Sequence, residues 1–314
     1  MKCTIQNIAD HLGLSRNTVS KALKNSSEVS ENTRNLVIKT ASKLGYKNAT
    51  FATPVIPASE TGSNGTILFL TRTYASDSEF WTTVLRGIES ILSNANYHLA
   101  ISIMSDSDLK QLNFPQTISD SSIKGIILVE ICDKVVCDAL SQFNLPIVSV
   151  DMPNVPFEEL NGIDVVTMES KKNLKKIINQ LIEKGAESFG FVGDLYSPNV
   201  SRGFQERYNA LSECLAEHQL PLNQKNCLLH QTPEDFRNFQ TTVTHLQAMI
   251  SLPDVFICGN DWTAIQLIYA LQFLGFQIPK DICVVGFDNI PAASRISPSL
   301  TTISTPQKYL GIAA

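Results

Sequence analysis

Side chains with the shapes that read nucleic-acid bases gather near the N-terminus, in the segment TIQNIADHLGLSRNTVSKALKN at residues 4–25. Arg16 has a fork of donors that matches guanine O6 and N7, and Asn17 carries an amide that matches adenine N6 and N7. Lys21 lies about one helical turn further and can reach a base or a phosphate. This combination of residues predicts contact with double-stranded DNA.

The small and apolar residues of the same segment have the spacing of a helix-turn-helix. Ala9 lets two helices approach closely, Gly13 permits a tight turn, and Val19 packs the second helix against the first. The apolar residues expected to complete this small core are Ile5, Ile8, Leu12, Val19 and Leu23. Ser15 is placed to cap the second helix, so residues 16–18 are expected to project outward as the first turn of a recognition helix.

A third helix is expected to follow a turn at Asn25. Ser30 is placed to cap this helix and Gly45 to close it, and the backbone amides at its start can hold a phosphate. Thr18 and Ser20 have the right size to contact phosphate oxygens. The full set of candidate DNA-contacting residues is Thr4, Ser15, Arg16, Asn17, Thr18, Ser20, Lys21, Asn25, Ser30, Thr33 and Tyr46. The alternative is a small three-helix bundle that contacts protein.

The charge of the chain is divided unevenly. Residues 1–47 hold eight Lys and Arg against three Asp and Glu, a net charge of +5, whereas the whole chain carries −5. The remaining residues therefore carry −10. A basic head on an acidic body confines contact with a polyanion to the head. Charge alone is equally compatible with an ordinary solvated surface.

Composition indicates a soluble globular protein, because 43% of its 314 residues are hydrophobic and 18% are charged. No apolar run approaches the roughly 18 residues that a membrane span needs. Asp10 and His11 interrupt the N-terminal apolar positions, which argues against a secretory signal. The seven cysteines lie singly in apolar stretches, which is typical of buried reduced thiols. We therefore expect a cytoplasmic protein with no membrane contact.

The body of the chain begins after a linker. Residues 48–65 are rich in Thr, Ser, Pro and Gly, and from Thr66 onward β-rich runs alternate with amphipathic stretches. The expected strands are TILFLT, HLAISI, KGIILV, PIVSV, IDVVT, SFGFVG, DVFIC and ICVVGF, and the expected helices lie at about 80–95, 134–143, 170–184, 201–218, 235–250 and 261–274. Such alternation indicates parallel sheets covered by helices, either one large sheet or two smaller doubly wound sheets.

Several residues of the body are placed to contact a ligand near the carboxyl ends of strands, where ligands bind in such sheets. Arg202 begins a helix and can bind two oxygens with its fork, Asp261 opens another helix and can accept hydroxyl protons, and Phe80 offers an aromatic face. Trp262 and Asp288 are weaker candidates, because each could serve structure alone. A helix cap, a surface ion pair and a core aromatic are the structural alternatives for the first three.

A ligand with many hydroxyl groups suits this combination of side chains. An aromatic face, one fork donor and one carboxylate are the groups that hold a sugar, and purines and phosphorylated sugars remain alternatives. The sequence therefore favours a small-molecule binding site in the body, with a sugar as its expected occupant.

The sequence lacks the parts of an enzyme active site. The five histidines are dispersed, no C-x-x-C or H-E-x-x-H motif occurs, and no G-x-S-x-G, G-x-G-x-x-G or Walker-type loop follows a strand. We expect no catalytic residue, no metal site and no cofactor. Two other classes remain: a pure solute-binding protein, which the basic head disfavours, and a nucleoid-type DNA-binding protein that responds to no ligand.

Taken together, these motifs resemble the lac repressor/gal repressor family. Residues 4–46 resemble the family's head, and RGIES, SRGFQERYNAL, GNDWTA and VVGFDNIPAASRISPSLTTISTP follow in the family's order, so the resemblance covers nearly the whole chain. It implies a small all-α helix-turn-helix head and a two-lobed α/β body like that of periplasmic binding proteins, with two doubly wound parallel sheets. It also matches Phe80, Arg202 and Asp261 to the family's ligand-contacting positions.

The resemblance further implies partners and domain limits. A homodimer would bind a pseudo-palindromic operator in double-stranded DNA and respond to a small-molecule effector, as a repressor does. The expected domains are a head at 1–47, a linker or degenerate hinge at 48–65, and an effector-binding and dimerisation domain at 66–314. The lobes of that domain are expected at about 66–160 with 291–314 and at about 161–290.

Two features depart from the family pattern. Family heads usually continue into a short hinge helix whose leucine wedges into the minor groove. Here Pro54 and Pro57 interrupt that region, and no leucine lies between Leu44 and Leu68, so we expect little bending of the operator. The chain also stops at Ala314, inside what resembles a helix that normally leads to one more strand, so the C-terminus is expected to be short.

Overall fold

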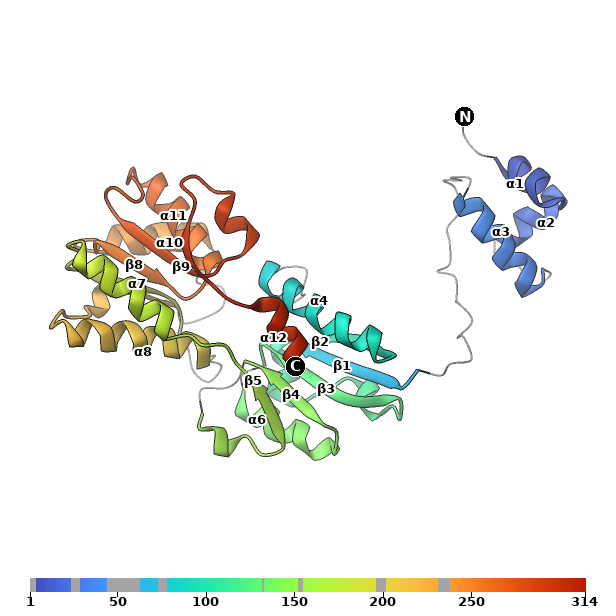
Figure 1. Cartoon of the computed structure of the whole chain (residues 1–314), viewed down its shortest axis with the longest axis horizontal. Coiled ribbons are helices and arrows are strands. Elements are labelled where there is room, and N and C mark those ends of the chain that lie inside the picture. The colour runs from blue at the N-terminus through green and yellow to red at the C-terminus, as the bar shows by residue number, and fades with distance from the viewer. Residues whose placement is uncertain are drawn as a thin grey trace. The chain divides into compact units, whose positions relative to one another are not determined.

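The computed structural model divides the chain into two compact units, residues 1–62 and 63–314, which we call the head and the body. The residues that it describes are 4–23, 29–43, 63–72, 78–131, 133–151, 155–195, 202–230 and 238–314. Figure 1 shows the elements of both units. Residues 48–62 of the expected linker fall outside the described residues, as do Asn25 and Tyr46 among the candidate DNA contacts.

The head consists of three helices, as the sequence predicts. They are α1 (Ile5–Leu12), α2 (Arg16–Leu23) and α3 (Glu31–Lys43). Ala9 and Val19 are buried in its core together with Val37 of α3. Gly13 ends α1 in the left-handed conformation with φ 64°, which a residue with a side chain adopts only with strain. The small, turn-forming and apolar positions of the motif therefore have the structural roles inferred from their spacing.

Side-chain oxygens cap the three helices of the head. Thr4 and Asn7 form a reciprocal capping box at the start of α1. The Ser15 hydroxyl accepts from the Thr18 amide at 3.0 Å, and the Ser30 hydroxyl accepts from the Thr33 amide at 3.3 Å. Both serine caps were expected from the sequence, and each satisfies one of the amides that a helix leaves unpaired.

The first lobe of the body contains a five-stranded parallel sheet with the order β2-β1-β3-β4-β5. The strands are β1 (Gly65–Thr71), β2 (Tyr97–Ile103), β3 (Ile123–Val129), β4 (Ile147–Val150) and β5 (Ile163–Val166), and the helices are α4 (Glu79–Asn94), α5 (Asp106–Gln111), α6 (Lys134–Leu140) and α12 (Gln307–Ala313). Helices α4 and α12 lie over one face and α6 lies over the other (Figure 1). Along β1, Phe69 packs toward α4, whereas Leu68 and Leu70 belong to the cluster beneath α6.

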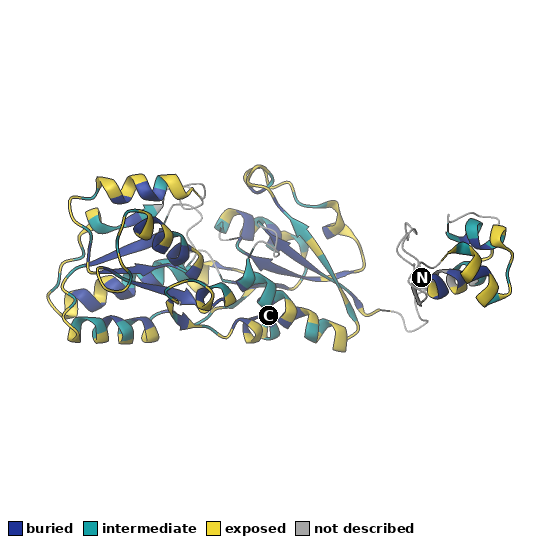
Figure 2. Cartoon of the chain, turned by 90° about the horizontal axis from the view of Figure 1, so that it is seen from above, coloured by how far each residue is buried: buried dark blue, intermediate teal, exposed yellow. Residues whose placement is uncertain are grey.

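The second lobe repeats the same architecture with the order β10-β9-β8-β6-β7, again all parallel. The strands are β6 (Phe189–Asp194), β7 (Leu228–His230), β8 (Val255–Cys258), β9 (Cys283–Asp288) and β10 (Thr301–Ser304), and the helices are α7 (Lys172–Glu183), α8 (Arg202–Glu217), α10 (Phe239–Ala248) and α11 (Asp261–Phe273). Helices α7 and α8 share one buried cluster with the sheet, and α10 and α11 share another. Figure 2 shows the buried strands between exposed helix faces.

Two edge strands change the expected limits of the lobes. Strand β5 joins the first sheet, so the chain crosses to the second lobe after residue 166 rather than near 160. Strand β10 joins the second sheet, so the chain returns after residue 304 rather than near 290. Neither β7 nor β10 was expected as a strand, because three or four residues at a sheet edge carry too little apolar pattern to be recognised.

The C-terminal helix α12 packs against α4 at very short range. A Cβ atom added to Gly87 would lie 2.2 Å from the Lys308 carbonyl oxygen, and one added to Gly311 would lie 2.0 Å from the Val84 carbonyl oxygen. Only glycine at both positions lets the two backbones come this close. This contact holds α12, the last described segment, against α4 of the first lobe.

Candidate functional site

The recognition helix of the head presents its first turn to solvent. Val19 and Ala22 bury one face of α2, and the end that begins after Ser15 leaves Arg16 and Asn17 exposed. Thr18, Ser20 and Lys21 are half-buried beside them. The two side chains expected to read base edges are therefore accessible together at the start of one helix.

The hydroxyl groups of the other described candidate DNA contacts in the head form hydrogen bonds at the helix starts. The hydroxyls of Ser15 and Thr18 lie 2.8 Å apart, as do those of Ser30 and Thr33. The Thr4 hydroxyl is bound to the Asn7 side chain. In the structure these hydroxyls therefore serve to fix the starts of the three helices.

The shared strand order of the two lobes locates the candidate ligand site. In each sheet the first and third strands of the lobe are neighbours, β1 beside β3 and β6 beside β8, so the connections leave in opposite directions there. Ligands of open α/β sheets bind outside the carboxyl ends of the strands at such a switch point. The residues that follow β1 and β3 in the first lobe, and β6 and β8 in the second, therefore border the candidate site.

Arg207 occupies this position in the second lobe. It lies in α8, only 3% of its surface is exposed, and its guanidinium donates to the Gly259 carbonyl beyond β8 at 2.5 Å. The guanidinium carbon lies 3.8 Å from the centre of the Phe287 ring and 5.4 Å from that of Phe204. Its Nε atom is buried and has no hydrogen-bond partner among the described residues. A buried guanidinium with one donor left over is ready to bind an oxygen.

The charges of four carboxylates act on Arg207: Asp288, Asp151, Glu206 and Asp261. Asp288 ends β9, Asp261 begins α11, and Asp151 follows β4 in the first lobe, so both lobes contribute. Asp288 is 7% exposed, its backbone has φ 113°, and its Oδ1 atom is buried without a partner among the described residues. Asp151 also has a positive φ, 70°. Unfavourable backbone conformations of this kind gather at ligand sites.

Burial controls the protonation of two of these carboxylates. It raises the pKa of Asp288 to about 7, with the Arg207 charge opposing the rise and the charges of Asp261 and Asp151 adding to it. Burial also raises the pKa of Asp261 to about 6, against the hydrogen bonds that its oxygens accept. The same burial lowers the pKa of Arg207. Burial therefore favours the neutral form of each of these three groups, and the Arg207 charge opposes this effect at Asp288.

Asp261 is fully buried and hydrogen-bonded, which the sequence did not predict. It is 0% exposed, and its oxygens accept from the Ile290 amide at 2.8 Å and from the Thr302 hydroxyl at 2.5 Å. The helix cap expected from Asp261 is instead provided by Asn260, whose side chain accepts from the Thr263 amide. The carboxylate thus joins the start of α11 to the segment after β9 and to β10.

Arg202, the first residue of α8, contacts both lobes. Its Nε donates to Glu206 at 2.9 Å, its Nη1 donates to the Val155 carbonyl at 3.1 Å, and its guanidinium carbon lies 4.4 Å from the centre of the Phe157 ring. Val155 and Phe157 belong to the first lobe, so Arg202 connects the two lobes. Arg202, which the sequence predicts as the ligand-contacting arginine, and Arg207, which is buried near the carboxylates, are therefore different residues of α8.

A signal for Arg207 exists in the sequence. In α8 the buried positions include Arg207, Ala210, Leu211 and Cys214, which recur with the period of one helix face. An arginine on the apolar face of an amphipathic helix must be paired or bind a ligand. The sequence analysis predicted a ligand contact at Arg202 instead, because this first residue of the helix directly follows a strand and loop.

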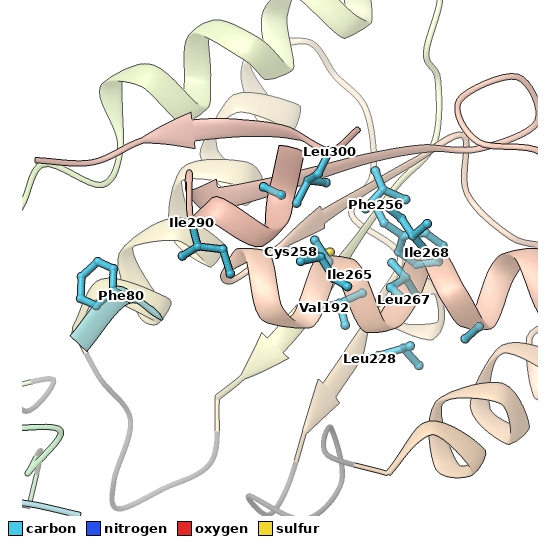
Figure 3. Close-up of a cluster of buried hydrophobic side chains, with 14 of the residues drawn as sticks. Phe80, Val192, Leu228, Phe256, Cys258, Ile265, Leu267, Ile268, Ile290 and Leu300 are labelled. Atoms are coloured by element: carbon cyan, nitrogen blue, oxygen red, sulfur yellow. The ribbon is translucent and has the colours of Figure 1, made fainter. Parts of the chain in front are cut away.

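The aromatic candidates occupy different environments. Phe80 is buried at the start of α4, its ring meets that of Trp81 edge-on at 4.7 Å, and Figure 3 shows it at the margin of the cluster that contains Ile290. Trp81 donates to Glu130, which follows β3 with φ 58°. Trp262 is 48% exposed. The structure therefore buries Phe80 in the core between the lobes and leaves Trp262 accessible.

A second polar cluster has the residue types of a thiol-protease site but not their chemistry. The Cys214 thiol and the His218 ring both lie against Asn179, at 3.1 and 2.7 Å from its Oδ1. Cys214 is fully buried, and that burial raises the pKa of its thiol. A buried protonated thiol is inert as a nucleophile, so this cluster fastens α7 to α8.

The described part of the chain shows no metal-binding arrangement of His, Cys, Asp and Glu. Its five described cysteines are free thiols. None of the helices described is long and apolar enough to cross a membrane.

Comparison with known proteins identifies the family. Residues 4–48 match the model of bacterial regulatory proteins, lacI family, and residues 178–314 match that of the periplasmic binding protein-like domain. The chain belongs to the lacI family. It is therefore a DNA-binding transcriptional regulator with a helix-turn-helix head and a two-lobed body.

Individual relatives agree over nearly the full length. Catabolite control protein A of Staphylococcus xylosus is 27% identical over 99% of this chain and 90% of that protein. A lac repressor dimer bound to operator and an anti-inducer has a TM-score of 0.64 at 19% identity, covering 100% of this chain and 90% of that one. A CelR-cellobiose complex has a TM-score of 0.67 at 18% identity, covering 99% and 90%. The relatives by sequence are regulators rather than enzymes.

The burial of Asp288 predicts a pH-dependent stability. Its pKa of about 7 exceeds the ordinary 3.8, so the folded state binds more protons than the unfolded state between these values. The stability that the protonated form contributes is thus fully present below about pH 4 and is lost as the pH rises through 7. Asp288→Asn cannot ionise and so avoids this loss. We therefore expect the unfolding free energy of the variant, relative to wild type, to rise by about 1–3 kcal/mol between pH 5 and pH 8, which appears as a rise in its relative melting temperature.

Thermal melts at several pH values measure this effect. Glu183→Gln removes the same charge from an exposed position at the end of α7 and is the matched control. A melting-temperature difference between Asp288→Asn and wild type that stays constant from pH 5 to pH 8 would contradict the assignment.

Proposed function

We propose that this protein is a cytoplasmic, non-enzymatic repressor whose homodimer binds a pseudo-palindromic operator and releases or tightens on it when a small-molecule effector binds between the lobes. The observation that carries the proposal is the group formed by Arg207, Asp288, Asp261 and Asp151, which combines both lobes with two buried atoms, Arg207 Nε and Asp288 Oδ1, that have no hydrogen-bond partner in the described part of the chain. The CelR neighbour was solved with cellobiose, which supports a sugar-like effector.

The effector site extends the residues inferred from the sequence. We place Arg207, Asp288 and Asp151 at the ligand, with Asp261 supporting the segment after β9 and Phe80 with Trp262 at the aromatic margins. Arg202 is assigned to the contact between the lobes. The head reads bases with Arg16 and Asn17, and the remaining head candidates position it on phosphates.

Control of DNA binding requires the ligand to favour one arrangement of the lobes. The lobes are joined by the Arg202 contact with Val155 and by the Ala292 amide, which donates to Glu79 of α4 at 2.9 Å. A ligand that binds residues of both lobes changes the balance between these contacts. We propose three domains: a head at 1–47, a linker at 48–65 and a body at 66–314. The change in the body would reach the head through the linker.

The dimer interface is proposed on an exposed aromatic face of the second lobe. Phe273 of α11 is 68% exposed and its ring lies 5.7 Å from that of Phe239 of α10. Tyr269 and Ile250 are also exposed. Aromatic clusters of this kind are typical of interface centres, and a second copy of the chain is the occupant that an operator with two half-sites requires.

Replacement of Phe273 by Glu tests this interface. A charge at the centre of an apolar contact weakens association, so we expect the dimer dissociation constant to rise at least roughly tenfold in sedimentation experiments. Val135→Glu changes an equally exposed apolar residue of α6 and should leave the dimer intact. If Phe273→Glu remains as dimeric as wild type, the interface lies elsewhere.

Replacement of Arg16 by Ala tests the DNA-reading role. Loss of a bidentate contact to guanine should relax sequence preference at one position of each half-site, at a cost of about 1–3 kcal/mol per half-site. Selection from a randomised operator library followed by fluorescence anisotropy measures both effects. Lys110→Ala removes a positive charge from an exposed position of α5 as a control. Uniform weakening on all sequences would make Arg16 a phosphate contact instead.

Replacement of Arg207 by Lys tests the effector site. Lys keeps the charge but lacks the fork and the Nε donor, so we expect the effector dissociation constant to rise by roughly ten- to a hundredfold while ligand-free operator affinity stays unchanged. The measurement is anisotropy of a labelled operator titrated with an effector found by a thermal-shift screen. Arg86→Lys on an exposed turn of α4 is the control. A wild-type response in Arg207→Lys would place the pocket elsewhere.

A further inference from the structure

One short segment of the second lobe is bound by side chains of the first. The segment is residues 288–293, which begin at the last residue of β9 and which we call the strap. The Gln307 side-chain amide of α12 donates to the Asp288 carbonyl oxygen at 2.6 Å, and the Ala292 backbone amide donates to Glu79 of α4 at 2.9 Å. Helices α12 and α4 both belong to the first lobe, so these two bonds hold the strap to that lobe.

The middle of the strap is held by the second lobe. The Ile290 backbone amide donates to Asp261 of α11 at 2.8 Å. The Ile290 side chain is buried in the same cluster as Phe80 of α4 (Figure 3). The strap is thus bound by both lobes, and they cannot move apart at this place without breaking one of these contacts.

The strap begins at a residue of the candidate effector site. Asp288 Oδ1 is buried with no hydrogen-bond partner in the described part of the chain, whereas the Asp288 carbonyl accepts from Gln307 and, at 3.2 Å, from the Thr305 hydroxyl. Its φ of 113° is a conformation that residues with a side chain rarely adopt, and the bonds to its carbonyl help to keep it. Because rotation of the peptide plane after Asp288 also shifts its side chain, the direction of the carboxylate depends on the bond from Gln307.

Gln307 is well placed to make and release this bond. Its side chain is 8% exposed, and its helix packs on α4 through Gly87 and Gly311, so the amide is carried by a rigid part of the first lobe. A buried amide without a partner costs free energy, so the bond favours the arrangement in which the first lobe contacts the strap. When the lobes separate, water can replace the bond on both sides.

We propose that Gln307 is a positioning residue for effector control, because its bond to the Asp288 carbonyl links the direction of the Asp288 carboxylate to the contact between the first lobe and the strap. The proposal rests on the effector site proposed above and adds the residue that transmits its occupancy. A ligand bound by the Asp288 side chain changes the stability of the Gln307 bond, and by linkage that bond changes the affinity for the ligand by the same factor. Gln307 acts through Asp288 and needs no contact with the ligand.

Hydrogen–deuterium exchange of the full-length, ligand-free protein tests the strap. Gln307→Met keeps the length of the side chain but has no donor, so we expect the Ile290 and Ala292 amides to exchange at least roughly threefold faster. The backbone amides of β8 should keep their wild-type rates, which separates release of the strap from a loss of stability of the whole lobe. Gln111→Met makes the same exchange at an exposed position of α5 and is the control.

Operator affinity tests whether the strap influences the head. The strap favours one arrangement of the lobes, and the affinity of the ligand-free protein for DNA depends on how far that arrangement is populated. We expect Gln307→Met to change this affinity at least roughly threefold in anisotropy titrations with the operator from the library selection described above. Gln111→Met should leave it unchanged. A residue that only stabilises the fold would lower the melting temperature without changing the operator affinity of the folded protein.

Replacement of Glu79 by Met tests the strap from its other end. The Glu79 side chain is 39% exposed, so this variant should fold even if Gln307→Met does not. We expect the Ala292 amide to exchange at least roughly threefold faster while the β8 amides keep their rates. In the double variant the two effects should not multiply, because both bonds hold one segment. Full multiplication would show two independent contacts and overturn the strap.

The outcomes distinguish this inference from the proposed function. Wild-type exchange of Ile290 and Ala292 in Gln307→Met would overturn it, as would an unchanged operator affinity or an equal acceleration of the β8 amides. The effector site stands in each of these cases if Arg207→Lys weakens the effector response. A wild-type response in Arg207→Lys would instead overturn the effector site, and with it this role of Gln307, even if the exchange rates are as expected.

Discussion

The buried guanidinium of Arg207 is the interaction on which the body of this regulator depends. It stacks on Phe287, donates to the carbonyl of Gly259 and faces acids from both lobes, so one side chain connects the ends of β8 and β9 with the segment after β4. Removing a cation from water is expensive, and only such close acids and an aromatic face offset the cost. Because Arg207 Nε and Asp288 Oδ1 are buried without a partner among the described residues, the same place is suited to a ligand.

The repeated strand order explains why this group forms where it does. Both sheets have their first and third strands adjacent, so each lobe opens a crevice at its carboxyl edge. The crossovers after β5 and β10 bring the two edges toward one another, and the hydrogen bonds of Asp261 with Ile290 and Thr302 fix the segments that border the second crevice. Binding or release of a ligand between these two edges would therefore act on contacts between the lobes rather than on contacts within a lobe.

The head follows a simpler physical rule. Its small core leaves no room for larger residues at Ala9 or Val19, and the turn at Gly13 sets the angle between α1 and α2. With the helix starts fixed by side-chain caps, the exposed residues of α2 present a definite pattern of donors. The division of charge, +5 in residues 1–47 within a chain of −5, is consistent with DNA contact through this unit.

The sequence by itself determined the helix-turn-helix, its caps, most strands and helices of the body, and the family, because these depend on local spacing, turn residues and apolar periods. It also pointed to Asp288, and to Asp261 as a residue at the start of α11. Tertiary structure alone decided that Arg207 is buried against Phe287 and the Gly259 carbonyl, that Asn260 caps α11, and that β5 and β10 lie in opposite sheets. Those outcomes depend on which residues distant in sequence come together, and local spacing contains no such information.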